Sequence, residues 1–292
     1  MRSVLLLLPL LLSAIFSLAQ LPPQLVYISS LGEGFDIFAF DLETETERRL
    51  TTNPGWDWGP QFNPALKAMI YNRTDTSDNF SLGLMASDGT ELEYDFGNFE
   101  EYILSPDGQS VLVTIAADDG DTKQIVMCNP DGGDTLKVTD HPSYNNRPLW
   151  SPDGRSILFL SNRDGDAELF LYDLEEGICQ QLTHDEVQQK YCTWSPDGKQ
   201  IAYTVQYYEE GQPDRNDVFM LDLATGNITR ITDQVYNDVE LSWSPDGRWI
   251  AFHSTREDGD QIYLMRPDGS GVRKVTTADA YHGEPAWIIP TH

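Results

Sequence analysis

The sequence predicts an all-β fold, namely a six-bladed β-propeller of four-stranded blades. Three observations support this prediction: a turn motif that recurs along the chain, a constant pattern of short strands between its copies, and two chain ends that complement each other. The motif is Ser-Pro-Asp-Gly, and its four complete copies are Ser105–Gly108, Ser151–Gly154, Ser195–Gly198 and Ser244–Gly247.

The copies recur at the spacing of one propeller blade. Their prolines, together with Pro64 of a degenerate earlier copy, lie 42 to 49 residues apart. Each interval holds short runs of β-branched and aromatic residues separated by polar turns, as at 156–160, 168–172 and 181–183, and a Trp-containing run precedes the next motif. Four short strands in about 45 residues are typical of a propeller blade, whereas helical repeats would show a 3.6-residue period.

The motif is suited to joining two antiparallel strands. Proline fixes φ at the second turn position, aspartate suits the third, and glycine can take a positive φ at the fourth. A tryptophan precedes three of the copies, at Trp150, Trp194 and Trp243. We expect these large side chains to fill the space between neighbouring sheets, where a blade buries its apolar area.

The two chain ends together supply one complete blade. Strands are expected at Leu25–Ser29, Asp36–Phe40 and Arg48–Thr52 without a strand to precede them, and Glu284–Ile288 is a leading strand without followers. Pairing of the first and last segments would close the ring and remove a free sheet edge. Counted with this composite blade, residues 20–292 form a single six-bladed propeller domain.

Residues 1–19 are predicted to be a secretory signal peptide. Arg2 supplies the charged start, Val4–Leu12 the apolar stretch and Ser17–Ala19 a small-residue cleavage site. The alternative is an uncleaved N-terminal anchor, although the apolar run is short for a membrane span. We therefore expect a periplasmic or secreted protein with no membrane span after removal of the signal.

The charge of the chain argues against binding to nucleic acid. Lys and Arg number 19 against 47 Asp and Glu, which gives a formal net charge of −28. Binding to phosphate backbones depends on clustered Lys and Arg. Much of the acidity comes from the aspartates of the recurring turns, so it is not interpreted as a designed binding patch.

The cysteines give no metal or redox motif. Cys128, Cys179 and Cys192 each lie in a strand-like run, and their spacing matches no known ligand pattern. We expect small buried hydrophobic residues, while a Cys179–Cys192 disulfide stays open as an alternative in an oxidising compartment.

No metal or cofactor is predicted. The histidines at 141, 184 and 282 are expected to be exposed loop residues, and none has the spacing of a zinc motif. Asp-Gly-Asp turns could coordinate calcium but lack the full loop pattern of a calcium site, so solvated hairpin turns are expected. These turns are Asp119–Asp121, Asp164–Asp166 and Asp258–Asp260.

The repeat resembles the TolB-type, WD40-like propeller repeat. The resemblance rests on Trp-Ser-Pro-Asp-Gly followed by Ser161–Gly165 with Leu169-Phe170, and by Ser254–Gly259 with Ile262-Tyr263. It implies a propeller of the kind found in a periplasmic partner-binding protein, whose additional N-terminal α/β domain we do not expect here. Similar propellers are also appendages of oligopeptidases and, more rarely, carbohydrate lyases. Arg163 and Arg256 are expected to bridge acidic neighbours across blades.

The family topology implies a binding site at one mouth of the central channel. The loops that join the last strand of one blade to the first strand of the next would lie at that mouth, and they carry aromatic residues at similar places. A ring of aromatics suits a protein or sugar partner, although the same rings could simply pack the blade tops. The candidate binding residues are Trp56, Trp58, Tyr144, Arg147, Tyr191, Tyr236, Tyr281 and Glu284.

The predicted function is therefore binding. The sequence contains no nucleophile elbow, phosphate-cradling loop or dinucleotide motif. We expect an exported, monomeric, non-enzymatic module that binds a protein or cell-envelope component at the loop mouth. The alternatives are a carbohydrate-active lyase or hydrolase that uses the same mouth, and the propeller remnant of an oligopeptidase.

Overall fold

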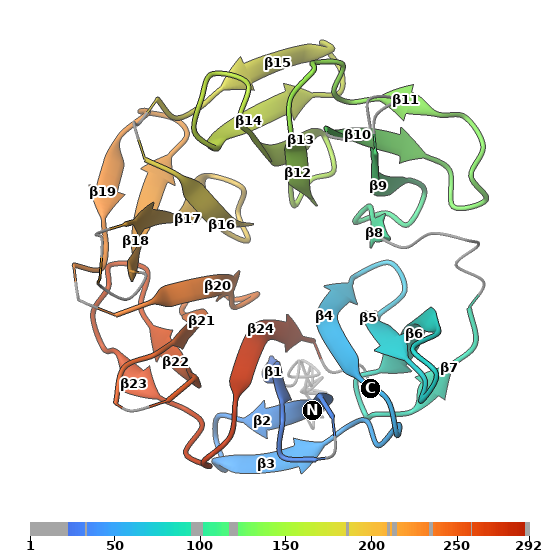
Figure 1. Cartoon of the computed structure of the whole chain (residues 1–292), viewed down its shortest axis with the longest axis vertical. Coiled ribbons are helices and arrows are strands. Elements are labelled where there is room, and N and C mark those ends of the chain that lie inside the picture. The colour runs from blue at the N-terminus through green and yellow to red at the C-terminus, as the bar shows by residue number, and fades with distance from the viewer. Residues whose placement is uncertain are drawn as a thin grey trace, which may run out of the picture.

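Six four-stranded antiparallel sheets stand in a ring around a central channel (Figure 1). The computed structural model describes residues 23–32, 34–94, 102–116, 122–184, 187–208, 211, 215–233, 236–257 and 259–289, and these ranges contain strands and turns but no helix. The predicted six-bladed propeller is confirmed. The predicted signal peptide, residues 1–19, lies outside the described residues. Within the described ranges, no helix is long and apolar enough to cross a membrane.

Each blade runs from an innermost strand at the channel to an outermost strand at the rim. The first three blades, in chain order, are β24-β1-β2-β3 (His282–Ile288, Gln24–Ser29, Asp36–Asp41, Thr46–Arg49), β4 to β7 (Asp57–Asn63, Ala68–Thr74, Phe80–Ala86, Glu91–Leu92) and β8 to β11 (Ile103–Leu104, Val111–Ala116, Lys123–Cys128, Leu136–Lys137). The other three are β12 to β15 (Asn145–Trp150, Ser156–Ser161, Glu168–Asp173, Ile178–Gln181), β16 to β19 (Gln189–Trp194, Gln200–Tyr207, Arg215–Asp222, Ile228–Arg230) and β20 to β23 (Asp238–Trp243, Ile250–Ser254, Gln261–Met265, Arg273–Lys274).

The two chain ends close the ring as predicted. Strand β24 pairs antiparallel with β1, with Trp287 opposite Leu25 and His282 opposite Ser29 (Figure 1). The outermost strand of this blade, β3, ends at Arg49 and not at the predicted Thr52, because Thr51 turns inward and its Oγ1 accepts a hydrogen bond from the Ile37 amide.

The same threonine contact recurs in five blades. In each, a buried threonine after the outermost strand accepts a backbone N–H from the third strand at 2.9 Å, which satisfies a donor that burial would otherwise leave unpaired. The threonines are Thr51, Thr139, Thr183, Thr232 and Thr276. This contact ties the rim of each blade to its middle.

The Ser-Pro-Asp-Gly turns have the predicted geometry. In all four copies the glycine amide donates to the serine carbonyl at 2.9 Å, and the glycine φ lies between 69° and 74°. The serine hydroxyl also donates to the aspartate of its own turn, at 2.6 to 2.8 Å. In all four copies these local hydrogen bonds hold the pKa of the turn aspartate below its usual value, with the Ser244 hydroxyl and the Arg248 amide acting on Asp246 against the effect of burial.

The tryptophans that precede the turns join neighbouring blades. The Trp150 indole donates to the Ile103 carbonyl of the preceding blade at 3.0 Å, and Trp287 donates to the Ser242 carbonyl at 3.1 Å. Trp243 packs in one core cluster with Ala202 and Met220 of the preceding blade. The expected position of these side chains between sheets is confirmed.

Two smaller predictions were partly wrong. Cys128 is buried, but Cys179 is exposed on outermost strand β15, and all three cysteines are free. Arg256 binds Asp238 of its own blade, and Arg163 contacts Asn145 of its own blade, so neither forms the predicted bridge across blades. Both arginines follow the second strand of a blade, which directs them back along the first strand of the same sheet.

Candidate functional site

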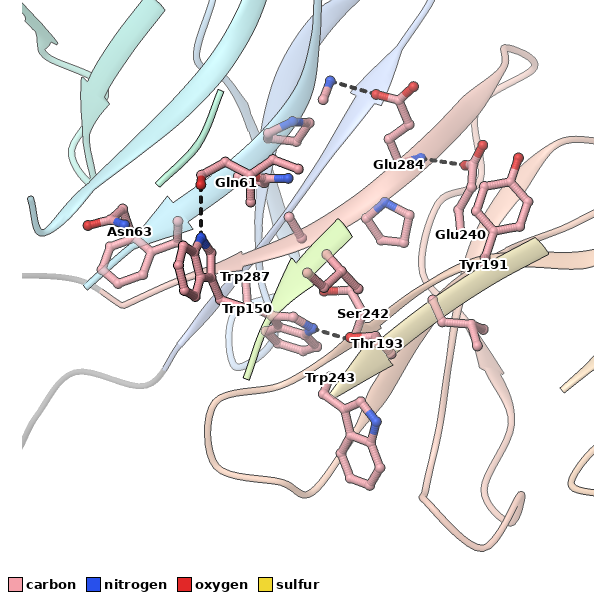
Figure 2. A pocket seen from close by; sticks show the side chains of 18 of the residues that line it. Gln61, Asn63, Trp150, Tyr191, Thr193, Glu240, Ser242, Trp243, Glu284 and Trp287 are labelled. Carbon is pink, nitrogen blue, oxygen red and sulfur yellow. Dashed lines mark hydrogen bonds between the residues drawn. The ribbon is translucent and has the colours of Figure 1, made fainter. Parts of the chain in front are cut away.

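The innermost strands surround a channel cavity of about 700 Å³. Its lining runs from residues near the start of these strands to Pro64, Pro106 and Pro245 of the turns that follow them. Figure 2 shows Glu284, Glu240 and Tyr191 together toward one end, with Trp150, Trp287 and Trp243 farther along. The end that holds the carboxylates is called the channel mouth below.

Bulges in five innermost strands shape the channel mouth. Pairing is irregular near the start of β4, β12, β16 and β20, and on the β24 side of β1. A bulge inserts an unpaired residue and redirects its side chain. Each bulge contains one residue that lies four positions before the first residue of the turn motif, or of its equivalent in the incomplete repeats. These bulge residues are Gly59, Arg147, Tyr191, Glu240 and Glu284.

Four of these five bulge residues have left-handed backbone conformations. The φ angles are 64° at Gly59, 50° at Arg147, 56° at Glu240 and 49° at Glu284. Arginine and glutamate take this conformation only with strain, so three such residues held there indicate that the surrounding sheet enforces the geometry. The sequence-based prediction included Arg147, Tyr191 and Glu284 but missed Gly59 and Glu240. Alignment of the repeats on the turn motif would have found both.

The bulge residues form a chain of contacts across three blades. The Gly59 amide donates to Glu284 Oε2 at 2.6 Å, and the Glu284 amide donates to Glu240 Oε2 at 2.7 Å (Figure 2). Burial raises the pKa of Glu284, and the neighbouring Glu240 carboxylate raises it further, while the Gly59 amide and Arg147 oppose this shift. Among the residues that the structure describes, the mouth therefore holds the two carboxylates of Glu240 and Glu284 close together and one guanidinium, that of Arg147.

Arg147 and Tyr191 complete the mouth. The Arg147 guanidinium carbon lies 4.3 Å from the centre of the Tyr191 ring, a cation–π contact between neighbouring blades. Burial raises the pKa of Tyr191, and the Glu240 carboxylate adds to this shift, so the phenol stays a hydrogen-bond donor at neutral pH.

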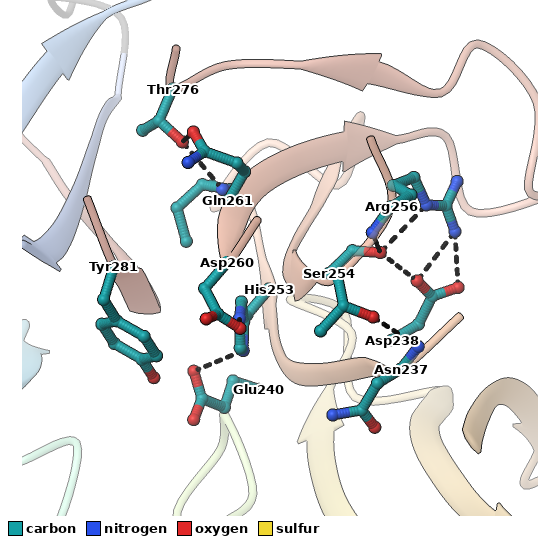
Figure 3. A network of polar contacts seen from close by, with 12 residues as sticks. Asn237, Asp238, Glu240, His253, Ser254, Arg256, Asp260, Gln261, Thr276 and Tyr281 are labelled. Carbon is teal, nitrogen blue, oxygen red and sulfur yellow. Dashed lines mark hydrogen bonds and ion pairs between the residues drawn. The ribbon is translucent and has the colours of Figure 1, made fainter. Parts of the chain in front are cut away.

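A polar network lies behind Glu240 (Figure 3). His253 Nε2 lies 3.0 Å from Asp260 Oδ1, and His253 Nδ1 lies 3.6 Å from Glu240 Oε2. The Tyr281 ring packs against His253 with 5.3 Å between ring centres. This network connects the mouth to the aromatic residues at the closing blade.

An aromatic pocket of about 460 Å³ opens beside Glu284. The Phe35 ring stands edge to face against Trp56 at 5.4 Å and against Tyr281 at 5.5 Å, and Trp58 is half-buried nearby. A Cβ added at Gly34 would come within 2.7 Å of Trp56, so this approach of the loop to the indole requires a glycine. The pocket is lined by Ile28, Phe35, Trp56, Trp58, Thr74, Asp78, Tyr281 and Glu284.

The structure divides the predicted aromatic residues into separate groups. Trp56, Trp58 and Tyr281 lie together in the aromatic pocket, and Tyr191 faces Arg147 in the channel. Tyr144 lines a further pocket together with Arg147 and Tyr191, whereas Tyr236 lies apart from both groups. Each of these two rings has a cation of this chain beside it. Trp58, Arg147, Tyr191 and Glu284 belong to strands and not to the loops where the aromatic ring was predicted.

The predicted environments of the histidines are partly correct. His141 and His184 are exposed, whereas His282 is fully buried, so its assignment to an exposed loop was wrong. It begins β24 and packs edge-on against Tyr27, because the closing strand starts two residues before the predicted 284. Among the residues that the structure describes, no group of three or more His, Cys, Asp or Glu side chains could hold a metal ion. Asp119–Asp121, Asp258 and His292 lie outside that part of the chain.

The family model of the TolB beta propeller domain matches residues 97–212 and 193–290. The chain belongs to this family. The resemblance found in the repeats is thereby confirmed over more than half of the sequence.

Individual relatives of this TolB-type propeller agree with the assignment. The Tol-Pal system protein TolB of Anaeromyxobacter dehalogenans is 31% identical over 166 residues, which are 57% of this chain and 27% of that protein. The chain spans about half, or less, of the length of the curated relatives it matches.

Solved structures show the same fold. TolB from Acinetobacter baumannii superimposes with a TM-score of 0.72 at 21% identity and covers 92% of this chain and 67% of that one. An oligogalacturonate lyase in complex with manganese reaches a TM-score of 0.54 at 15% identity over 84% of this chain and 72% of that one. At these identities the likeness concerns the fold alone.

Proposed function

We propose that the protein is an exported, non-enzymatic binding module that takes a protein or another cell-envelope component at the channel mouth. One observation carries this proposal. Bulges in five innermost strands converge, so that Arg147, Tyr191, Glu240 and Glu284 meet in one concave site. Polar groups that converge in a cavity with aromatic walls are typical of recognition sites.

Exposed aromatic side chains around the mouth support a macromolecular partner. Trp56 is 54% exposed and Tyr144 is 38% exposed. Large aromatics at the rim of a cavity often carry much of the binding energy at protein interfaces. We therefore propose that the partner covers both side chains at once.

One named relative supports the proposed location. The Anaeromyxobacter relative is named as a protein of the Tol-Pal system. By analogy we propose a periplasmic or secreted location, a partner in the cell envelope, and a monomeric chain. The removal of residues 1–19 as a signal peptide is part of the same proposal.

Capture of the partner from a native envelope extract tests the proposal. The wild-type protein is compared with a double variant, Trp56→Ala with Tyr144→Ala, and with a matched rim variant, Ile178→Ser with Ile228→Ser. Ile178 and Ile228 are exposed on outermost strands far from the channel. We expect the mouth variant to lose the captured component and the rim variant to keep it, with thermal unfolding of both close to wild type. Equal capture by all three proteins would overturn the site.

Activity assays test the non-enzymatic part separately. The purified protein is incubated with acidic polysaccharides and with peptide substrates, and product formation is followed over time. We expect none above the rate in buffer. Turnover that is lost on Glu240→Gln replacement would replace the binding role with a catalytic one at the same mouth.

A further inference from the structure

Around the channel mouth this chain places its own cations over its own aromatic rings. The face of an aromatic ring carries partial negative charge and attracts a nearby guanidinium or ammonium group. Three of the predicted mouth aromatics satisfy this attraction internally: Lys123 lies 5.7 Å from Tyr144, Arg147 lies 4.3 Å from Tyr191, and Arg256 lies 5.2 Å from Tyr236, each measured to the ring centre.

The aromatic pocket departs from this pattern. In the part of the chain that the structure describes, no lysine or arginine lines the pocket or lies over the rings of Phe35, Trp56, Trp58 or Tyr281. The rings are held in place by their edge-to-face contacts, and buried Ile28 also lines the pocket. The pocket thus combines fixed ring faces with an apolar surface.

Two carboxylates give the aromatic pocket a negative charge. Asp78 lines it from an exposed turn, and Glu284 lines it from the side of the channel. Only Oε2 of Glu284 accepts a hydrogen bond within the described residues, from the Gly59 amide. Glu284 Oε1 is therefore available to a donor from outside the chain.

We propose that the aromatic pocket takes an arginine side chain of the partner protein. The inference rests on the proposed function and specifies its chemistry. A guanidinium is flat, so it can stack on an aromatic ring while it donates to a carboxylate such as Glu284. Arginine is also the cation in two of the three internal pairs, and the cavity of about 460 Å³ has room for its stem. The net charge of −28 would attract a basic segment before contact.

Tryptophan side-chain signals test the inference without the partner. The protein contains seven tryptophans, and labelling their indole nitrogens with ¹⁵N gives separate N–H signals that single Trp→Phe variants assign. The probe is N-acetyl-arginine amide, and its neutral citrulline counterpart is the control. We expect saturable shifts of the Trp56 and Trp58 signals with the arginine probe and none with citrulline, while Trp243 stays unchanged. Equal shifts with both probes, no saturable shift, or tighter binding of the lysine analogue would overturn the proposal.

Charge-neutral variants test the two carboxylates. Glu284→Gln keeps an acceptor for the Gly59 amide and is expected to lower the affinity for the arginine probe about tenfold. In Asp78→Asn the new asparagine suits the left-handed backbone at φ 60°, and the variant is expected to lower the affinity for the probe about threefold. The matched control is Asp134→Asn, which removes the same charge at another left-handed turn residue, φ 46°, in a different blade and should leave the affinity unchanged. Unchanged affinity in Glu284→Gln would contradict the assignment.

The two proposals can fail separately. If the arginine probe does not bind but the Trp56→Ala, Tyr144→Ala variant still loses the envelope partner, the arginine assignment is wrong and the mouth remains the binding surface. If the probe binds to the wild type but the Trp56→Ala, Tyr144→Ala variant captures the envelope partner as well as the wild type does, the proposed function is wrong.

Discussion

The backbone amide of Glu284 donates a hydrogen bond to the carboxylate of Glu240, with 2.7 Å between the nitrogen and Oε2. This contact joins the closing strand β24 to β20 of the neighbouring blade. The Gly59 amide then donates to Glu284, which extends the link to β4. Three innermost strands are thus connected at the channel mouth by carboxylates that accept backbone hydrogen bonds. Left-handed residues in the bulges make these contacts possible.

Replacement of Gly59 by alanine tests how tightly the mouth is fixed. The φ of 64° costs an alanine about 1–2 kcal/mol, and the new Cβ would meet the Asn72 side-chain nitrogen at 2.5 Å. We expect the free energy of unfolding in urea to fall by more than this strain alone. Gly226→Ala is the matched control, since its φ is 70° but nothing lies within 4 Å of the added carbon. Equal losses in both variants would show that the mouth adjusts freely.

The Asp238–Arg256 ion pair is expected to contribute strongly to the stability of its blade. Asp238 is fully buried, and both its oxygens accept hydrogen bonds from Arg256, at 2.8 and 2.6 Å (Figure 3). Asp238→Ala would leave a largely buried guanidinium without its partner, so we expect the unfolding free energy to drop by about 3–5 kcal/mol. The exposed pair Lys137–Asp140, 3.7 Å apart, serves as the control. Its Lys137→Ala variant should lose at most about 1 kcal/mol, and a comparable loss in both variants would contradict this account.

Buried His282 is expected to make ring closure sensitive to pH. Burial lowers its pKa from 6.5, against the opposing effects of Glu47 and the Ala278 carbonyl. Below pH 6.5 the unfolded chain therefore binds a proton at this histidine before the folded chain does, so acidification favours unfolding. We expect urea midpoints of the wild type to fall from pH 7 to pH 5 more steeply than those of His282→Gln. Parallel curves for the two proteins would exclude His282 as the cause.

The fold follows from the sequence because its information is local and repeated. Each Ser-Pro-Asp-Gly turn is specified by four residues, and the incomplete repeats at the two ends can pair in only one way to close the ring. The mouth is harder to predict, because Arg147, Glu240 and Glu284 have left-handed backbones that nothing in their residue types requires. Their common distance from the turn motif is the feature of the sequence from which their shared position could have been predicted. Tyr144 and Trp56 differ in that only the ring of Tyr144 has a cation of this chain beside it within the described residues. This difference depends on the three-dimensional arrangement of the side chains, which the sequence alone does not give.

Site-specific photo-cross-linking tests whether the channel mouth is the binding surface. A photoreactive amino acid replaces Trp56 or Tyr144 at the mouth, Ile178 at the rim, or Asp153 in a turn at the other end of the channel, and the variants are irradiated in native envelope extract. We expect the same partner to be cross-linked from positions 56 and 144 and not from 178 or 153. Cross-linking from position 178 or 153 alone would contradict it.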